Sequence, residues 1–100
     1  MDDRLIVKKA IEEVERGKEL AIATIIDAKG STPREAGAKM VVLADGSTYG
    51  TVGGGSLEKR VIELCLEAID DGKSHRVHLP LNAEGVEMIC GGEVDVFIDV

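Results

Sequence analysis

The chain of 100 residues is the length of one domain, and its 44% apolar and 31% charged residues are typical of a globular protein rather than a disordered one. A formal net charge of −7 argues against binding along a nucleic acid, which requires a basic face. One Phe, one Tyr and no Trp leave almost no aromatic surface on which bases could stack. We therefore expect an aliphatic core and no nucleic-acid partner.

The N-terminus shows no targeting pattern, and no apolar stretch approaches the roughly 20 residues that span a membrane. We expect a cytoplasmic protein without membrane contact, folded as a single domain over residues 1–100 and associating as a homo-oligomer, which would add stability at this size. Cys65 and Cys90 lie far apart in unlike contexts, so free thiols are expected. His75 and His78 should face opposite sides of a strand, and no metal site is predicted.

The hydrophobic pattern predicts two helices and five strands in the order α-β-β-β-α-β-β. Residues 3–16 predict a surface helix whose buried stripe is Val7, Ala10, Ile11 and Val14. Residues 20–26 are short and β-branched, which indicates a strand buried on both faces. Strands at 39–43 and 47–52 flank Asp45-Gly46, a hairpin signal, and a helix from about residue 56 to Asp71 precedes strands at 75–80 and 93–100. The expected fold is α/β (α+β), a two-layer sandwich with a mixed sheet of about five strands.

The most informative segment is Gly53-Gly54-Gly55-Ser56-Leu57-Glu58, between a predicted strand and a predicted helix. Each glycine in regular structure costs roughly 0.5–1 kcal/mol relative to alanine, so three in succession indicate that the backbone itself is needed. The N–H groups ahead of a helix attract anions, and Ser56 is a plausible cap for this helix. The segment is neither a P-loop nor a dinucleotide fingerprint. A tight strand-to-helix crossover is the alternative that the pattern leaves open.

Glu58 changes the ligand that this segment predicts. A carboxylate in the first helical turn already satisfies the positive helix end and repels a phosphate placed close by. It can, however, accept two hydrogen bonds side by side from paired N–H donors. Between Lys29 and Arg60 the chain carries five basic and three acidic residues, which suits a small anionic ligand, although chance spacing on a solvated surface would look the same. We expect a ligand with both an anionic group and N–H donors.

Two further loops carry residues suited to binding. Ser31, Thr32 and Arg34 in the segment 30–35 offer hydroxyls and a planar fork for phosphate, although a turn with a solvated arginine is the alternative. Cys90 precedes Gly91 and Gly92, which allow other groups to approach its sulfur; a small buried residue before a turn is equally compatible. Because each loop adjoins a predicted strand, all three could gather along one rim of the sheet.

At these same loops the chain resembles the N-terminal domain of the XdhC/CoxI family, accessory proteins in the maturation of xanthine dehydrogenase and carbon monoxide dehydrogenase. The matching stretches are residues 23–25 with 30–40, Asp45-Gly46 with 50–58, and 90–94. The resemblance implies a chaperone rather than an enzyme. It would bind the molybdenum cofactor (molybdopterin) while its terminal sulfur is installed with a cysteine desulfurase, and then pass it to a molybdenum hydroxylase subunit.

The positions of these motifs and the chemistry of their residues suggest which residues would hold this cofactor. Arg34, Lys39 and the amides of residues 54–56 would bind its phosphate, Glu58 or Glu35 would accept the N–H donors of the pterin, and Cys90 would lie near molybdenum or carry sulfur. The complete expected set is Ser31, Thr32, Arg34, Glu35, Lys39, Gly53, Gly54, Gly55, Ser56, Glu58, Cys90, Gly91 and Gly92.

One departure from the family pattern concerns a second domain. Many members continue into a Rossmann-like domain, for which residues 1–100 have no counterpart. The chain would then act with a separate Rossmann-like subunit, through a dimer, or in a reduced role. The main alternative function is an interaction module that docks a desulfurase or dehydrogenase subunit without holding the cofactor. A small nucleotide- or phosphate-binding enzyme is a weaker alternative, because no acid–base pair accompanies the glycine loop.

Overall fold

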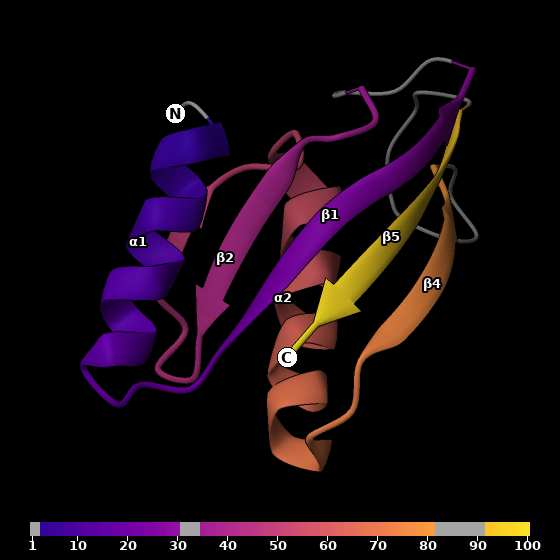
Figure 1. Ribbon diagram of the computed structural model, residues 1–100. Coiled ribbons are helices and arrows are strands. Elements are labelled where there is room, and N and C mark those ends of the chain that lie inside the picture. Colours follow the sequence, from indigo (N-terminus) through magenta and orange to yellow (C-terminus); the bar gives the residue numbers. More distant parts are fainter. Residues whose placement is uncertain (1–2, 31–34, 82–91) are drawn as a thin grey trace.

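The computed structural model describes residues 3–30, 35–81 and 92–100. Its elements are α1 (Asp3–Glu15), β1 (Leu20–Lys29), β2 (Lys39–Leu43), β3 (Thr48–Gly50), α2 (Gly55–Asp71), β4 (His75–Pro80) and β5 (Glu93–Asp99). The strands form one sheet in the order β3-β2-β1-β5-β4 (Figure 1). The mixed α and β composition and the order of the elements are confirmed.

The strand directions differ from the prediction of a mixed sheet, because all four neighbouring pairs are antiparallel. The path of α2 explains the difference. It carries the chain from β3 at one edge of the sheet to β4 at the other edge. β3 and β4 run in the same direction but are not neighbours in the sheet. The crossover through α2 therefore produces no parallel pair of strands.

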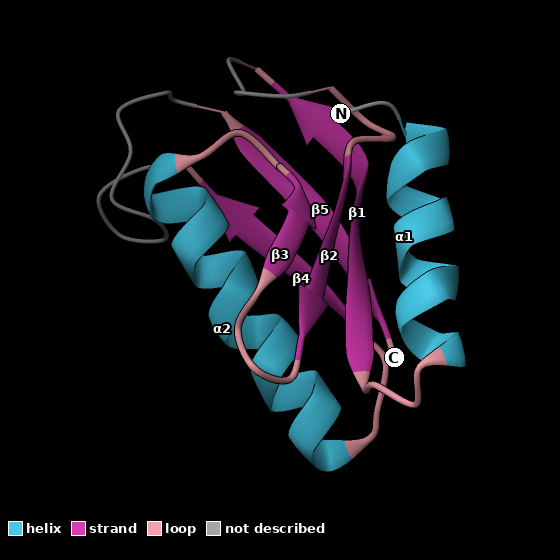
Figure 2. Cartoon of the chain, turned by 90° about the vertical axis from the view of Figure 1, so that its left-hand side faces the viewer, coloured by secondary structure: helices cyan, strands magenta, loops and turns pink. Residues whose placement is uncertain are grey.

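The two helices cover opposite faces of the sheet, so the domain has three layers where two were predicted (Figure 2). In β2, Met40 and Val42 belong to the core cluster under α2, whereas Val41 and Leu43 pack with α1. The physical reason is visible in the sequence of β2. An apolar run without alternation can be buried only if both faces of its strand are covered.

The predicted buried stripe of α1 is wrong for three of its four residues. Ile6, Ala10 and Glu13 are buried, whereas the other faces of the helix leave Val7, Ile11 and Val14 exposed at 39%, 54% and 57%. The position of Ile6 explains why α1 buries a different face from the predicted one. A Cβ atom at Gly50 would lie only 2.7 Å from Ile6 Cδ1. The missing side chain at this glycine therefore admits Ile6 against the sheet.

The main core lies between α2 and the sheet. The apolar spacing in this helix predicts a stripe of five residues that faces the core. Four of them, Leu57, Val61, Cys65 and Ala68, are fully buried, and the fifth, Leu64, is partly buried. Gly72 ends α2 in the left-handed conformation, with its N–H group 2.8 Å from the carbonyl oxygen of Ala68. Neither described helix is long and apolar enough to cross a membrane. The stripe fixes the position of the helix start, where the glycine segment lies.

Candidate functional site

The strand directions bring the flanks of the three predicted loops to one end of the sheet. Lys29, the last residue of β1, is opposite Glu93, the first residue of β5, and Glu93 is also opposite Pro80 at the end of β4. Because β3 runs in the same direction as β1, it ends toward this same rim, and α2 begins there (Figure 2). The loop-bearing rim, as we call it, therefore collects the described ends of segments that are far apart in the sequence.

The backbone of the glycine turn, residues 53–55, adopts a conformation that favours glycine at all three positions. Gly53, Gly54 and Gly55 have φ angles of 129°, 78° and 60°. Apart from the adjoining backbone, no heavy atom of the described residues lies within 4 Å of where a Cβ atom would stand at Gly54 or Gly55. The backbone conformation, rather than close packing inside the chain, is therefore what requires these two glycines, and the space beside them is open.

The expectation that Ser56 caps α2 is wrong. The N-cap is Gly54, no side chain caps the helix, and the carbonyl oxygen of Gly54 accepts the N–H of Glu58 at 3.3 Å. Because Gly55 is already the first helical residue, Ser56 lies two positions past the N-cap, inside the helix, and does not cap the free N–H groups from outside. The N-cap residue of α2 thus makes no side-chain hydrogen bond to the first turn, in which Glu58 is the acidic residue.

Glu58 is held by a residue that the sequence analysis did not select. The Thr51 hydroxyl donates a hydrogen bond to Glu58 Oε1 at 2.5 Å, and it accepts the N–H of Gly53 at 3.0 Å. Both side chains are half-buried. In the sequence, the signal was a hydroxyl residue just before the glycine turn and an acid just after it, which become neighbours only once the turn has formed.

The other predicted binding residues divide into two groups. One group, Ser31, Thr32, Arg34, Cys90 and Gly91, lies outside the described residues. Glu35 is exposed, Lys39 is the half-buried first residue of β2, and Gly92 is buried, with its carbonyl oxygen accepting the N–H of Leu81 at 2.8 Å.

Lys39 does not share a face with Glu58. Along β2 the side chains alternate, and Met40 faces α2 while Val41 faces α1. Alternation therefore puts Lys39 on the α1 side of the sheet, whereas Glu58 projects from α2 on the other side. Among the described residues, the structure brings together Glu58, Thr51 and the glycine turn, but it does not add Lys39 to them.

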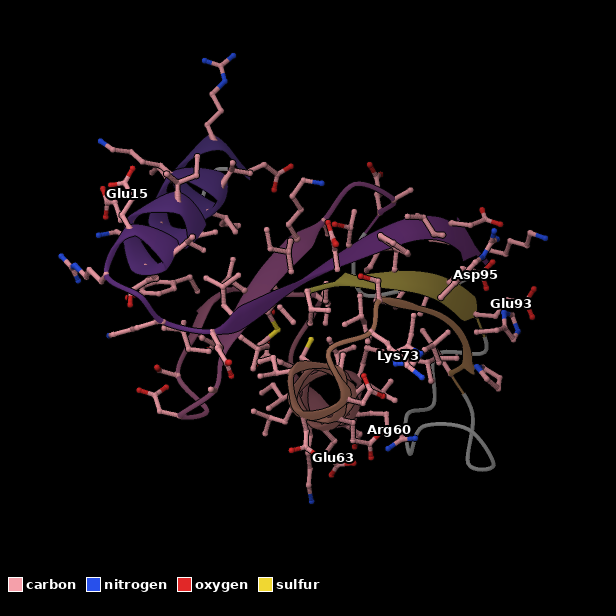
Figure 3. All side chains as sticks on the ribbon, turned by 60° about the horizontal axis from the view of Figure 1, so that its bottom comes forward. Glu15, Arg60, Glu63, Lys73, Glu93 and Asp95 are labelled. Atoms are coloured by element: carbon pink, nitrogen blue, oxygen red, sulfur yellow. The ribbon has the colours of Figure 1, made fainter. Side chains whose placement is uncertain are left out.

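A charged cluster lies on the sheet face opposite α2, close to the loop-bearing rim. Arg76 donates to Asp95 at 2.8 Å, and His78 lies 2.5 Å from Asp95 and 3.6 Å from Glu93 (Figure 3 labels both acids). The hydrogen bonds from Arg76 and then from His78 hold the pKa of Asp95 below its ordinary value of 3.8. Within the described part of the chain, no set of three His, Cys, Asp or Glu side chains is arranged to hold a metal ion.

Cys65 is a core residue, as predicted from its place on the stripe of α2. Its side chain is fully buried, and the burial raises the pKa of its thiol to about 12. A thiol in this environment stays protonated and does not act as a nucleophile. Sulfur chemistry at the proposed site would therefore depend on another residue.

The chain belongs to the XdhC and CoxI family, whose model matches residues 13–80. Over 98 residues it is 41% identical to the uncharacterized protein YqeB of Escherichia coli (strain K12), a match that covers 95% of this chain and 18% of YqeB. Over 95 residues it is 30% identical to the molybdenum cofactor insertion chaperone PaoD of the same organism, which covers 93% of this chain and 30% of PaoD.

The fold also recurs in a crystal structure described as a xanthine dehydrogenase from Bacillus halodurans. The TM-score is 0.77 at 24% sequence identity, over 93% of this chain and 29% of that chain. At this identity the likeness shows a shared fold. The chain spans less than a third of the length of each of these three proteins.

Proposed function

We propose that this domain binds the molybdenum cofactor and assists its sulfuration and insertion into a molybdenum hydroxylase. Membership of the XdhC and CoxI family and the likeness to PaoD support a role in cofactor handling. The observation that carries the proposal is the placement of Glu58 beside the open glycine turn at the start of α2. An acidic acceptor and exposed backbone in one place suit a ligand that combines N–H donors with an anionic group.

The residues of the turn fit the chemistry of this cofactor. The described residues assign no donor to Glu58 Oε2, which leaves that oxygen to accept N–H groups of the pterin. The backbone beside Gly54 and Gly55 is accessible to an anionic group. We further propose that Ser31, Thr32 and Arg34 contribute to phosphate binding and that Cys90 lies near the metal. When bound, the cofactor itself supplies the metal and its sulfur; the protein supplies a holding site.

The expected partners follow from this role. A molybdenum hydroxylase subunit would receive the cofactor, and a cysteine desulfurase would supply the sulfur. We also propose a Rossmann-like subunit and a second copy of this chain as partners at the site. In this proposal the protein is a maturation factor in the cytoplasm and turns over no substrate of its own.

The second candidate function is a docking module that binds a partner protein without holding the cofactor. The observation that favours it is the apolar ridge formed by Val7, Ile11 and Val14 on α1, which the rest of the described chain leaves exposed. A protein partner could bury such a ridge. The two functions differ in one simple respect, which is whether the purified chain retains the cofactor.

Gel filtration of the chain mixed with molybdopterin tests the proposal. We expect the wild-type chain to retain the pterin and Glu58→Gln to bind about 10–100-fold more weakly, since a hydrogen bond to a charged group contributes about 1.5–3 kcal/mol. The matched control is Glu63→Gln on the same helix, an exposed acid paired with Arg60 at 3.2 Å (Figure 3). If the wild-type chain releases the cofactor, the docking function replaces this one.

A further inference from the structure

We propose that Thr51 is a positioning residue that fixes Glu58 and the glycine turn for the ligand. This inference rests on the proposed cofactor site and names a determinant of its selectivity. Thr51 precedes the turn and Glu58 follows it, so their hydrogen bond closes residues 51–58 into a ring. The geometry of this ring carries the inference.

The Thr51 hydroxyl is constrained from both sides. It accepts the N–H of Gly53 at 3.0 Å, which occupies one lone pair of its oxygen. Its single proton is donated to Glu58 Oε1 at 2.5 Å, and an ionised carboxylate can only accept. The direction of the bond is therefore fixed, and the same hydroxyl holds both the start of the turn and the carboxylate beyond it.

The ring is anchored in the core at two points. Val52 follows Thr51 and Leu57 precedes Glu58, and both are fully buried in the cluster under α2. Between these anchors the three glycines have no side chains with which to hold their conformation, and glycine loses more freedom on ordering than any other residue. Among the described residues, the Thr51–Glu58 bond is thus the side-chain hydrogen bond that spans the turn.

The bond also determines what Glu58 offers to a ligand. Thr51 takes one lone pair of Oε1, and within residues 3–30, 35–81 and 92–100 no other hydrogen bond to this carboxylate is formed. With respect to these residues, the other lone pair of Oε1 and both lone pairs of Oε2 are available to a ligand. Two carboxylate oxygens held in one orientation match two adjacent N–H donors, such as the ring N–H and the 2-amino group of a pterin. The 2-oxo counterpart of pterin, lumazine, lacks the amino donor. We therefore expect the site to prefer the 2-amino form and to lose this preference when Glu58 is free to rotate.

The test compares Thr51→Val, which lacks the hydroxyl, with Thr51→Ser, which restores it. Without ligand, hydrogen exchange of the amides of residues 53–58 should be faster in Thr51→Val and close to wild type in Thr51→Ser. With ligand, Thr51→Val should bind molybdopterin about tenfold more weakly, the size expected from one lost hydrogen bond of about 1.4 kcal/mol. Combining Thr51→Val with Glu58→Gln should add little to Glu58→Gln alone, because both changes act on the same carboxylate.

Competition with two small probes measures the selectivity. Pterin, which has the 2-amino group, should displace molybdopterin from the wild-type chain at a lower concentration than lumazine, its 2-oxo counterpart. In Thr51→Val the two probes should compete equally. If Thr51→Val keeps the wild-type affinity and preference, Thr51 does not position Glu58, and the proposed function stands. If the wild-type chain binds no pterin, the proposed function and the selectivity fail together, while the exchange rates still decide whether Thr51 holds the turn.

Discussion

Lys18 Nζ lies 2.9 Å from Glu13 Oε2, and Arg16 Nη1 lies 3.1 Å from Oε1 of the same carboxylate. The Glu13 side chain is only 3% exposed, so these two cations compensate a charge that has been removed from water. The hydrogen bond from Lys18 holds the pKa of Glu13 below its ordinary 4.5, and Glu13 in turn holds the pKa of Lys18 above 10.5. The end of α1 is thereby tied to the residues that lead into β1.

The Lys18–Glu13 ion pair should make the effect of Lys18→Met on the free energy of unfolding depend on pH. A lowered pKa for Glu13 means that its contribution is present above about pH 4.5 and is lost as the pH falls through the folded value. A raised pKa for Lys18 means that its contribution is present below about pH 10.5 and is lost as the pH rises through the folded value. We predict that the urea midpoint of Lys18→Met differs most from wild type between these limits. Lys29→Met, which affects the more exposed Lys29–Asp27 pair, is the control, and a difference independent of pH would contradict the prediction.

Replacement of Gly50 by alanine should destabilise the domain strongly. A Cβ atom there would lie 2.6 Å from the carbonyl oxygen of Lys39 and 2.7 Å from Ile6 Cδ1, and φ is +80°. Gly46→Ala is the matched control, since its φ is +90° but nothing lies within 4 Å of the added atom. We expect Gly50→Ala to lose about 1–3 kcal/mol more than Gly46→Ala in urea unfolding, the range for overpacking. Equal losses would mean that Ile6 moves aside without cost.

The glycine turn should respond differently. Gly54→Ala and Gly55→Ala add a Cβ atom in open space, so each should cost only backbone strain. We expect about 1–2 kcal/mol at Gly55 and about 1–3 kcal/mol at Gly54, whose φ of 78° and ψ of −173° lie in a region almost confined to glycine. Gly46→Ala carries the same kind of strain at a distant hairpin. Molybdopterin binding should fall in the two turn variants and stay unchanged in Gly46→Ala. Binding that follows stability alone across all three variants would argue against the turn as part of the site.

The buried thiol of Cys65 should resist labelling. With its pKa raised to about 12 by burial, Cys65 presents almost no thiolate at neutral pH. In a Cys90→Ser background, where Cys65 is the remaining cysteine, we expect no reaction with a thiol reagent in the folded protein and complete reaction in denaturant. The rate of labelling then reports unfolding. Fast labelling under native conditions would show that α2 opens locally around this residue.

Local signals in the sequence were sufficient to predict the hairpin of β2 and β3, the bounds of β4 and the buried side of α2. The Asp45-Gly46 pair marked a hairpin that forms between β2 and β3, and the bounds of β4 agree with its apolar alternation. The buried stripe of α2 was readable because it is broad and ends at a glycine. Each of these features leaves a local pattern in the sequence, a turn pair or an apolar periodicity, and this pattern could be recognised although β4 pairs with β5 and α2 packs on distant strands.

Other features depend on contacts between distant residues and could not be read in this way. The side of α1 that is buried depends on the space at Gly50, and the number of layers depends on which face each helix covers. At the candidate site, the glycine turn and Glu58 were predicted from the sequence. Thr51 was not, because it contacts Glu58 only after the turn has formed. A hydroxyl seven positions from an acid has no periodic signature.

The sheet divides the buried side chains into two unequal sets, and this gives the domain a graded stability. The set beneath α1 gathers Ile6, Ala10, Val41 and Leu43, whereas the set beneath α2 draws on every strand except β3. Detaching α1 would therefore expose few apolar side chains and leave the second set, with the loop-bearing rim, in place. In native-state hydrogen exchange, the amides of α1 should open first and those of α2 only with global unfolding. A partly opened domain without a docked α1 would still carry the glycine turn.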